Sequence, residues 1–218
     1  MNISHHISDN LLMAYSAGQL PEAFSLVLAT HVSLCDECRA RLASFDAVGG
    51  AVLEDTRNVA MSSGSLAATM KLIGERAGQD VAQQCASPRG MTGVLPAPLR
   101  DYVGGDLDAV RWRSVGGGVR QAILPTARDA RVRLLYIPAG AQVPDHGHQG
   151  IELTQVLRGA YRDERDYFGP GDIDIATEET RHTPIADPYE DCICLAATDA
   201  PLKFSAFLPK IAQPFFRI

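Results

Sequence analysis

The chain has 218 residues, of which 46% are hydrophobic and 21% are charged, and its formal net charge is −6. This composition is sufficient for a buried core and excludes wholesale disorder. A DNA backbone would repel the acidic surface, so direct nucleic-acid binding is not expected. Because no apolar run reaches the roughly 18 residues of a membrane span and the polar N-terminus shows no export signal, we expect a cytoplasmic protein.

The acidic charge is spread unevenly, since residues 1–85 contain 5 Lys and Arg against 9 Asp and Glu. An acidic segment of this kind suits a basic protein partner, such as one that itself binds DNA. The five cysteines are an odd number and include a C-x2-C pair, Cys35 and Cys38, and a C-x-C pair, Cys192 and Cys194. Metal or redox chemistry in a reducing compartment fits these pairs better than a disulfide framework.

The first 75 residues have apolar side chains at a spacing of three to four, which predicts helices. The expected helices are one from Ser8 or Asp9 to Gly18, one opened by Pro21 and Glu22, one over residues 39–48, and one over residues 65–73. The third is expected to stop at the glycine pair that follows it. The fourth is too weakly supported to stand alone.

Residues 78–99 are rich in Gly, Gln, Ser and Pro and show little periodicity, which indicates a linker. Beyond it, β-type runs alternate with turns at residues 118–124, 132–137, 151–157, 173–176 and 193–196. Closely spaced strands of this kind indicate a sandwich or a barrel. We therefore predict a multi-domain α + β protein: helical residues 1–77, a linker over 78–99, a β-barrel over 100–197, and a C-terminal tail over 198–218 packed on the barrel.

His31, Cys35 and Cys38 are spaced as zinc ligands. A residue four positions after His31 lies on the same helical face, and the C-x2-C step lets two thiolates converge at the end of that helix. The fourth ligand has to come from elsewhere, and His6 and His5 both precede the first predicted helix. A structural zinc can contribute on the order of 10 kcal/mol to the folding of such a small domain. We predict one zinc in residues 1–75; the alternative is buried cysteines and surface histidines.

A second set of metal-binding residue types lies in the β region, in the pattern Gly140-x5-His146-x-His148-x3-Glu152-x6-Gly159. Alternate side chains of a strand share a face, so the two histidines point together into a barrel and the glutamate returns on the next strand. These spacings resemble the first sequence motif of cupin barrels. The second cupin motif is present in a looser form, as a Phe-Gly-Pro-Gly-Asp turn at residues 168–172.

His182 follows that turn on the next predicted strand, farther along than the usual motif spacing. It is the only histidine left in the β region, so we expect it to be the fourth ligand of the barrel metal. Three imidazoles and one carboxylate hold a divalent ion with one or two open positions, a set compatible with Zn, Fe, Mn or Ni. Zinc is our first choice, and a barrel with an empty site is the alternative.

Taken together, the two halves resemble the ChrR-type zinc-binding anti-sigma factors, which carry a C-terminal cupin domain. The stretches that carry the resemblance are 30–38 (THVSLCDEC), 143–148 (VPDHGH) and 213–218 (QPFFRI). The resemblance implies that the fourth zinc ligand is His6 rather than His5, and that Leu66, Met70 and Ile73 of the fourth helix face a sigma factor. It also implies a 1:1 complex with an extracytoplasmic-function sigma factor, released when singlet oxygen or organic peroxide acts through the cupin. If they do not face a sigma factor, Leu66, Met70 and Ile73 are ordinary residues of a hydrophobic core.

Three alternatives stay open from the residues themselves. Cys192 and Cys194 share one face of a predicted strand, which suits either a redox pair near the barrel metal or two buried small hydrophobes. A metal-dependent enzyme of dioxygenase type would explain the barrel, but it leaves the zinc helical domain without a purpose. An adaptor for another protein, with the barrel as a dimerisation module, is the remaining possibility. For the regulator, which is not an enzyme, we expect residues 1–85 to suffice for inhibition and the barrel to be needed for release.

Overall fold

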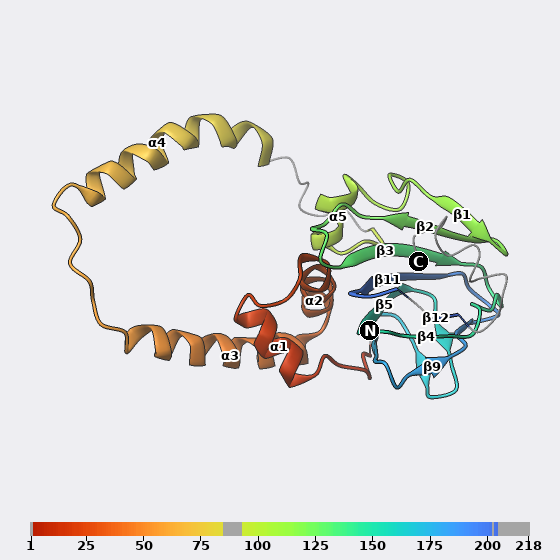
Figure 1. Ribbon diagram of the computed structural model, residues 1–218. Helices are drawn as coiled ribbons and strands as arrows, with labels where there is room; N and C mark the ends of the chain where they lie inside the picture. Colours follow the sequence, from red (N-terminus) through yellow and green to blue (C-terminus); the bar gives the residue numbers. More distant parts are fainter. Residues whose placement is uncertain (1, 85–92, 202, 205–218) are drawn as a thin grey trace. The chain divides into compact units, whose positions relative to one another are not determined.

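The computed structural model describes residues 2–84, 93–201, 203 and 204 (Figure 1). Most of the tail predicted to pack on the barrel, including the stretch 213–218, lies outside these residues. The chain divides into two compact units, one made of Met1–Gly49 with Gly93–Ile218 and the other of Gly50–Thr92. Among the helices of the described residues, none combines the length and the apolarity that a bilayer span demands.

The helices of the described chain are α1 (Asp9–Ser16), α2 (Glu22–Leu34), α3 (Asp36–Glu54), α4 (Ser65–Gln84) and α5 (Ala97–Val103). The first helix and the start of the second lie where the sequence predicts them. Ser8 occupies the N-cap of α1 in an extended conformation, and Gly18 follows the helix with a positive φ of 65°. Pro21 directly precedes α2 and fixes its first turn.

The third helix differs from the prediction, because it continues through Gly49 and Gly50 to Glu54. A glycine inside a helix costs only about 1 kcal/mol relative to alanine, so a pair of them weakens a helix without ending it. The fourth helix also exceeds its predicted end at residue 73 and reaches Gln84, within the range predicted to be a linker. The linker-like composition of residues 78–84 is therefore the reason that the predicted end of this helix came too early.

The β region is built from short antiparallel strands. They are β1 (Arg113–Gly116), β2 (Val119–Ile123), β3 (Arg131–Ile137), β4 (His146–Gly147), β5 (Glu152–Arg158), β6 (Tyr161–Arg162), β7 (Tyr167–Phe168), β8 (Ile173–Ala176), β9 (Arg181–His182), β10 (Ile185–Ala186), β11 (Cys192–Thr198) and β12 (Lys203–Phe204). Six form one sheet in the order β1-β2-β3-β11-β5-β8, and the others form two three-stranded sheets, β10-β6-β7 and β12-β4-β9. The five predicted runs correspond to β2, β3, β5, β8 and β11.

Strand β11 separates two hydrophobic clusters, because its side chains alternate between the two faces of the six-stranded sheet. Leu195 and its neighbours on one face belong to a cluster shared with the helices. Cys192 and Cys194 on the other face belong to a second cluster with Tyr161 and Phe168. The first cluster joins the helices to the sheet, and the second fills the space between the sheets.

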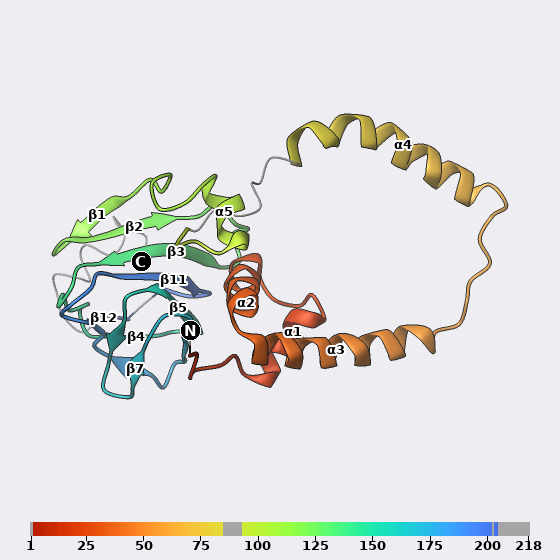
Figure 2. The ribbon, with the colours of Figure 1, turned by 180° about the vertical axis from the view of Figure 1, so that it is seen from behind.

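Helix α2 is buried on most of its surface, which its nearly continuous apolar sequence explains. Its buried residues are Ala23, Phe24, Leu26, Val27, Leu28, Thr30 and His31. The helix contacts α1 and α5 as well as strands β3, β5 and β11, and Figures 1 and 2 show it beside the ends of those strands. The N-terminal helices therefore share one hydrophobic core with the barrel, rather than enclosing a separate core of their own.

Candidate metal centres

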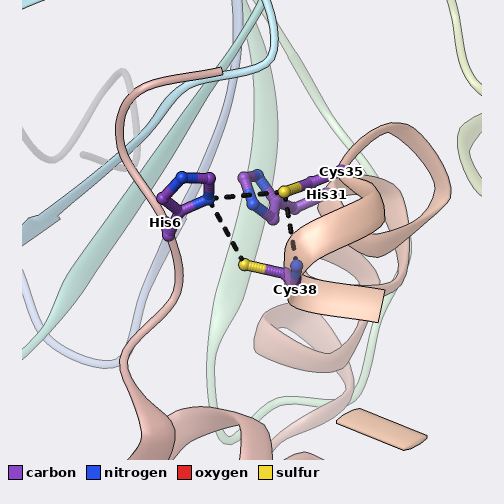
Figure 3. Close-up of side chains that lie close together, drawn as sticks. All are labelled: His6, His31, Cys35 and Cys38. Atoms are coloured by element: carbon purple, nitrogen blue, oxygen red, sulfur yellow. Dashed lines mark hydrogen bonds between the residues drawn. The ribbon is translucent and has the colours of Figure 1, made fainter. Parts of the chain in front are cut away.

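The four predicted N-terminal ligands come together from three pieces of chain (Figure 3). His31 lies in the last turn of α2, Cys35 caps that helix, Cys38 lies in the first turn of α3, and His6 lies on the extended segment before α1. Nδ1 of His6 is 3.3 Å from Sγ of Cys35 and 3.7 Å from Sγ of Cys38. One donor atom from each residue lies within 4.8 Å of all the others.

This donor set fits zinc in both chemistry and size. Tetrahedral zinc with bonds of 2.0–2.3 Å keeps its ligand atoms about 3.6 Å apart. Both ring nitrogens of His31 are buried and make no hydrogen bond within the described chain. Such orphaned polar atoms are costly unless they have a ligand. Two imidazoles and two thiols would therefore hold one zinc ion here.

The electrostatics of the cluster favour metal binding at neutral pH. Burial lowers the pKa of His31 to about 4, with the nearby His6 adding to the effect, so the ring is neutral and can donate a lone pair. Burial raises the pKa of Cys38 to about 11, which keeps the thiol protonated until a metal displaces the proton. Binding of a metal ion at this cluster would therefore release a proton.

Glu37 is a functional residue that sequence reasoning did not identify. Its Oε2 lies 3.3 Å from Nε2 of His6, the ring nitrogen that faces away from the two sulfur atoms. A carboxylate in this position fixes the tautomer of a metal-binding imidazole and leaves Nδ1 for the metal. The only signal in the sequence was the acidic pair between the two cysteines. His5 lies outside the cluster, and its ring packs on Phe168 in a tilted arrangement with 4.5 Å between centroids.

The second cluster lies in the barrel and contains the four residues predicted for it. His146 is on β4, Glu152 begins β5 and His182 is on β9, while His148 follows β4 directly. His146 and His182 are register partners in the antiparallel pair of β4 and β9. Their Nε2 atoms are 3.1 Å apart, and Nδ1 of His148 is 3.3 Å from Oε2 of Glu152. All four side chains are buried, with donors within 4.8 Å of one another.

The charges of this cluster also suit a divalent ion. Burial lowers the pKa of His148 to about 4, so this ring is neutral. Burial would raise the pKa of Glu152, but its hydrogen bond to His146 and the nearby imidazoles outweigh burial and lower that pKa. Three imidazole nitrogens and an ionised carboxylate oxygen form a donor set that first-row divalent metals accept.

Two of the barrel histidines are oriented by hydrogen bonds at their other ring nitrogen. Nδ1 of His146 donates to the carbonyl oxygen of Pro144 at 2.9 Å. Nδ1 of His182 donates to Oδ2 of Asp163 at 2.8 Å. Both rings therefore present Nε2 to the cluster, as metal-binding histidines with fixed tautomers do. Asp163 was not identified from the sequence, because it is distant from His182 along the chain and has no motif of its own.

Asp163, Asp174 and His182 form a further group with converging ligand atoms. Arg165 already occupies this group, since its Nη2 lies 2.6 Å from Oδ2 of Asp163 and 2.7 Å from Oδ2 of Asp174. The guanidinium balances the two carboxylates with charge-assisted hydrogen bonds. We therefore interpret this group as an ionic network that supports the metal ligands, rather than as a third metal site.

Cys192 and Cys194 lie side by side in the second hydrophobic cluster, with their sulfur atoms 3.3 Å apart. Both side chains are buried. The hydrogen bond from Cys192 and burial raise the pKa of Cys194 well above its usual range, and the charges of Glu152 and Asp174 act in the same direction. Because the thiolate is the reactive form of cysteine, the Cys194 sulfur is a weak nucleophile in this arrangement.

In the unit made of Gly50–Thr92, the apolar residues of α4 are exposed. Leu66 is 73% exposed, Met70 59% and Ile73 55%. Their spacing of four and three residues places them on one face of the helix. Large apolar side chains that are this exposed along one helical face are available to a partner.

Comparison with known proteins covers the whole chain. Residues 101–201 match the family model described as the ChrR cupin-like domain. The chain is 61% identical over 218 residues to the anti-sigma-E factor ChrR of Cereibacter sphaeroides, an alignment that covers both proteins completely. It is also similar to a chain in the crystal structure of Rhodobacter sphaeroides SigE in complex with the anti-sigma ChrR, with 59% identity and a TM-score of 0.77 over 90% of this chain and 99% of that one. The chain therefore belongs to the ChrR family of anti-sigma factors.

Proposed function

We propose that this protein is an anti-sigma factor that binds an extracytoplasmic-function sigma factor as a 1:1 heterodimer. The observation that carries the proposal is the converged His6, His31, Cys35 and Cys38 cluster, in a chain that aligns end to end with an anti-sigma factor. A solved relative is described as a complex with SigE. Because a sigma factor acts on RNA polymerase, we place this protein in the cytoplasm, and we assign it a regulatory rather than an enzymatic role.

The zinc cluster would give the N-terminal helices the shape that the sigma factor recognises. When bound, zinc supplies folding free energy and no catalysis, since all four positions are taken by protein ligands. His31 and Cys35 belong to the end of α2, Cys38 to the start of α3, and His6 to the segment before α1. Holding these pieces together fixes the angle between the two helices. Without the metal, buried His31 would keep two unpaired nitrogens.

Helix α4 is the proposed docking element for the sigma factor. Leu66, Met70 and Ile73 form an exposed apolar face, which suits the helix-in-groove mode of recognition. In functional terms we divide the chain into sigma-binding residues 1–77, a connection over 78–99, a sensing barrel over 100–197 and a tail over 198–218. The acidic balance of the first 85 residues suits a basic sigma factor.

The barrel is the proposed sensor of singlet oxygen or organic peroxide. His146, His148, Glu152 and His182 would hold a divalent ion, with zinc as our choice, and leave one or two positions open. Cys192 and Cys194 are the proposed redox residues beside this site, with two buried small hydrophobes as the alternative. Reaction at the barrel site would then shift the equilibrium of the sigma complex toward dissociation.

Sigma binding is tested by copurifying the full chain with its cognate extracytoplasmic-function sigma factor. We expect a stoichiometric complex with the natural chain, and at least about a 100-fold loss of affinity for Met70→Asp, because a buried charge without a partner costs several kcal/mol. Lys71→Ala is the matched control on the same helix, since Lys71 is exposed and lies on a different face. If Met70→Asp bound as tightly as Lys71→Ala, α4 would not be the docking element. If the natural chain bound no sigma factor, the function itself would be wrong.

Sensing is tested separately by exposing the preformed complex to singlet oxygen or an organic peroxide. The natural chain is expected to release the sigma factor, and His146→Ala is expected to form the complex and retain it. Ser substitutions at Cys192 and Cys194 test their contribution in the same assay. Release from His146→Ala at the natural rate would remove the barrel site from the mechanism, and unchanged release from the serine variant would leave the cysteines a packing role.

A further inference from the structure

Residues 161–172, called the bridging segment below, contact the surroundings of both metal centres. The segment contains β6 and β7, the turn between them, and the Gly-Pro-Gly-Asp turn that leads into β8. The two turns lie at different ends of β7. The turn between β6 and β7 contacts His182 of the barrel cluster. The turn before β8, together with Asp166 and Phe168, contacts His5, the residue before His6 of the zinc cluster.

The turn between β6 and β7 is fixed against the barrel ligand His182. Oδ2 of Asp163 accepts hydrogen bonds from Nδ1 of His182 at 2.8 Å and from Nη2 of Arg165 at 2.6 Å, and the Asp163 side chain is fully buried. Oδ1 of Asp163 accepts from the backbone N–H of Arg165 and of Asp166, at 2.8 and 3.1 Å. The carboxylate of Glu164 accepts from the backbone N–H of Thr183, the residue after His182, at 3.0 Å.

The same segment binds the residues before α1, which include His6 of the zinc cluster. Oδ1 of Asp172 accepts from the backbone N–H of Ser4 at 2.7 Å and of His5 at 2.9 Å. Nε2 of His5 donates to Oδ2 of Asp166 at 3.1 Å, and the His5 ring packs on Phe168. His5 was the competing candidate for the zinc ligand. Its contacts give it a different role, as an anchor one residue before His6.

We propose that the bridging segment couples the two metal centres, with Asp163 as the positioning residue of His182 and with Asp166 and Asp172 as the positioning residues of His5. The inference rests on the proposed function, for which it supplies the route from sensor to sigma-binding helices. When His182 leaves its place in the barrel cluster, Asp163 loses one of its two side-chain donors. The turn that bears Asp166 then becomes free to move, and the segment before His6 loses part of its support. Buried hydrogen-bonded networks of this kind carry coupling because they have few alternative arrangements.

The coupling is measured on the zinc-loaded full chain by hydrogen–deuterium exchange, read at the backbone amides of Ser4 and His5. The variants are His146→Ala, which removes a barrel ligand outside the segment; Asp166→Ala, which removes the bond between His5 and the turn that bears Asp163; and the two combined. Glu190→Ala is the matched control, because it breaks an exposed ion pair with Arg158 elsewhere on the barrel. Metal content of both clusters is measured in parallel.

We expect His146→Ala to speed exchange at Ser4 and His5 by about tenfold, within the usual range of coupling between two sites. In the Asp166→Ala background, where these amides already exchange faster, His146→Ala should add less than about twofold, since the route is already cut. Glu190→Ala should change nothing. Unchanged exchange in His146→Ala would overturn the coupling, and so would full additivity of the two substitutions.

If His146→Ala also speeds exchange along β11, the barrel itself has opened, and Asp163→Asn replaces it as the perturbation. That variant keeps all four barrel ligands and the size of the side chain while it weakens the bonds to His182 and Arg165. It should speed exchange at Ser4 and His5 with β11 unchanged, and failure to do so would refute the proposal. The readout needs no sigma factor, so absence of sigma binding would count against the proposed function alone.

Discussion

Leu28 tests whether the zinc-binding helices and the barrel unfold as one unit. This side chain lies on α2, has no solvent exposure and belongs to the hydrophobic cluster that the helices share with β3, β5 and β11. The perturbation is Leu28→Ala. The same substitution at exposed Leu66 on α4 is the matched control.

The expected cost follows from the burial of Leu28. A buried Leu→Ala change removes about 2–5 kcal/mol from the free energy of unfolding, because a cavity is added to the lost transfer free energy. With a urea dependence of about 2 kcal/mol per molar, the midpoint of unfolding should fall by about 1 to 2.5 M. Leu66→Ala should stay within about 0.5 kcal/mol of the natural chain, since it changes little buried surface.

The assay uses the single tryptophan of the chain, Trp112, which reports on the barrel. Its ring contacts Tyr136 of β3, with 6.1 Å between centroids, so its fluorescence follows the unfolding of the sheet. Circular dichroism at 222 nm follows the helices in the same samples, at a fixed free zinc concentration. We expect both signals to move together in Leu28→Ala. If the circular dichroism midpoint fell while the Trp112 midpoint stayed in place, the helices would unfold independently and the shared core would have no energetic meaning.

Three further predictions concern the metal clusters. Cys38→Ser should lower zinc content by one ion per chain and abolish copurification of the sigma factor, while metal at the barrel cluster, measured by mass spectrometry, stays unchanged. The metal-free chain should lose stability as the pH falls from about 6.5 to about 4, because the unfolded chain takes up protons at His31 and His148 that the folded chain, with pKa values lowered to about 4, does not take up. The fall of the urea midpoint over this window should be less steep for His31→Ala. Glu37→Gln should weaken zinc binding at the N-terminal cluster by about 10-fold or more, as loss of a carboxylate that orients a ligand does, whereas Asp36→Asn should leave zinc affinity unchanged in a chelator competition.

Part of each candidate metal cluster was predictable because it follows a local geometric rule, whereas His6 was expected only from the family resemblance and His182 only as the histidine left in the β region. The i, i+4 step from His31 to Cys35 follows from the period of a helix, and the alternation of His146 and His148 follows from the period of a strand. The longer strands were predictable for the same reason, since β3, β5 and β11 each span seven residues of patterned sequence. Patterns of this length rise above the background of ordinary composition.

What could not be predicted depends on contacts between distant parts of the chain. Strands β4, β6, β7, β9 and β10 have two residues each, which is too short for any alternation to be visible. Asp163 and Arg165 are ordinary charged residues in the sequence, and only the fold brings them beside His182. The turn that ends at Asp172 was visible in the sequence, but its bonds to Ser4 and His5 were not. Whether α3 continues through Gly49 and Gly50 depends on a balance of small local free energies, which the sequence pattern does not reveal.

The shared core has a consequence for how a signal in the barrel can reach the sigma-binding helices. Two domains joined only by a flexible linker would have to signal by changing how often they meet, because a linker transmits no strain. Here α2 carries His31 of the N-terminal cluster and packs directly on the strand β5 that carries Glu152 of the barrel cluster. Each metal cluster thus lies on an element that contacts an element of the other. In such a packed arrangement, displacement of a side chain at one cluster would change the free energy of the other, since close-packed interiors deform in discrete steps rather than gradually. A regulator built in this way can keep its sigma factor tightly bound at rest and still respond to a chemical event at a buried site.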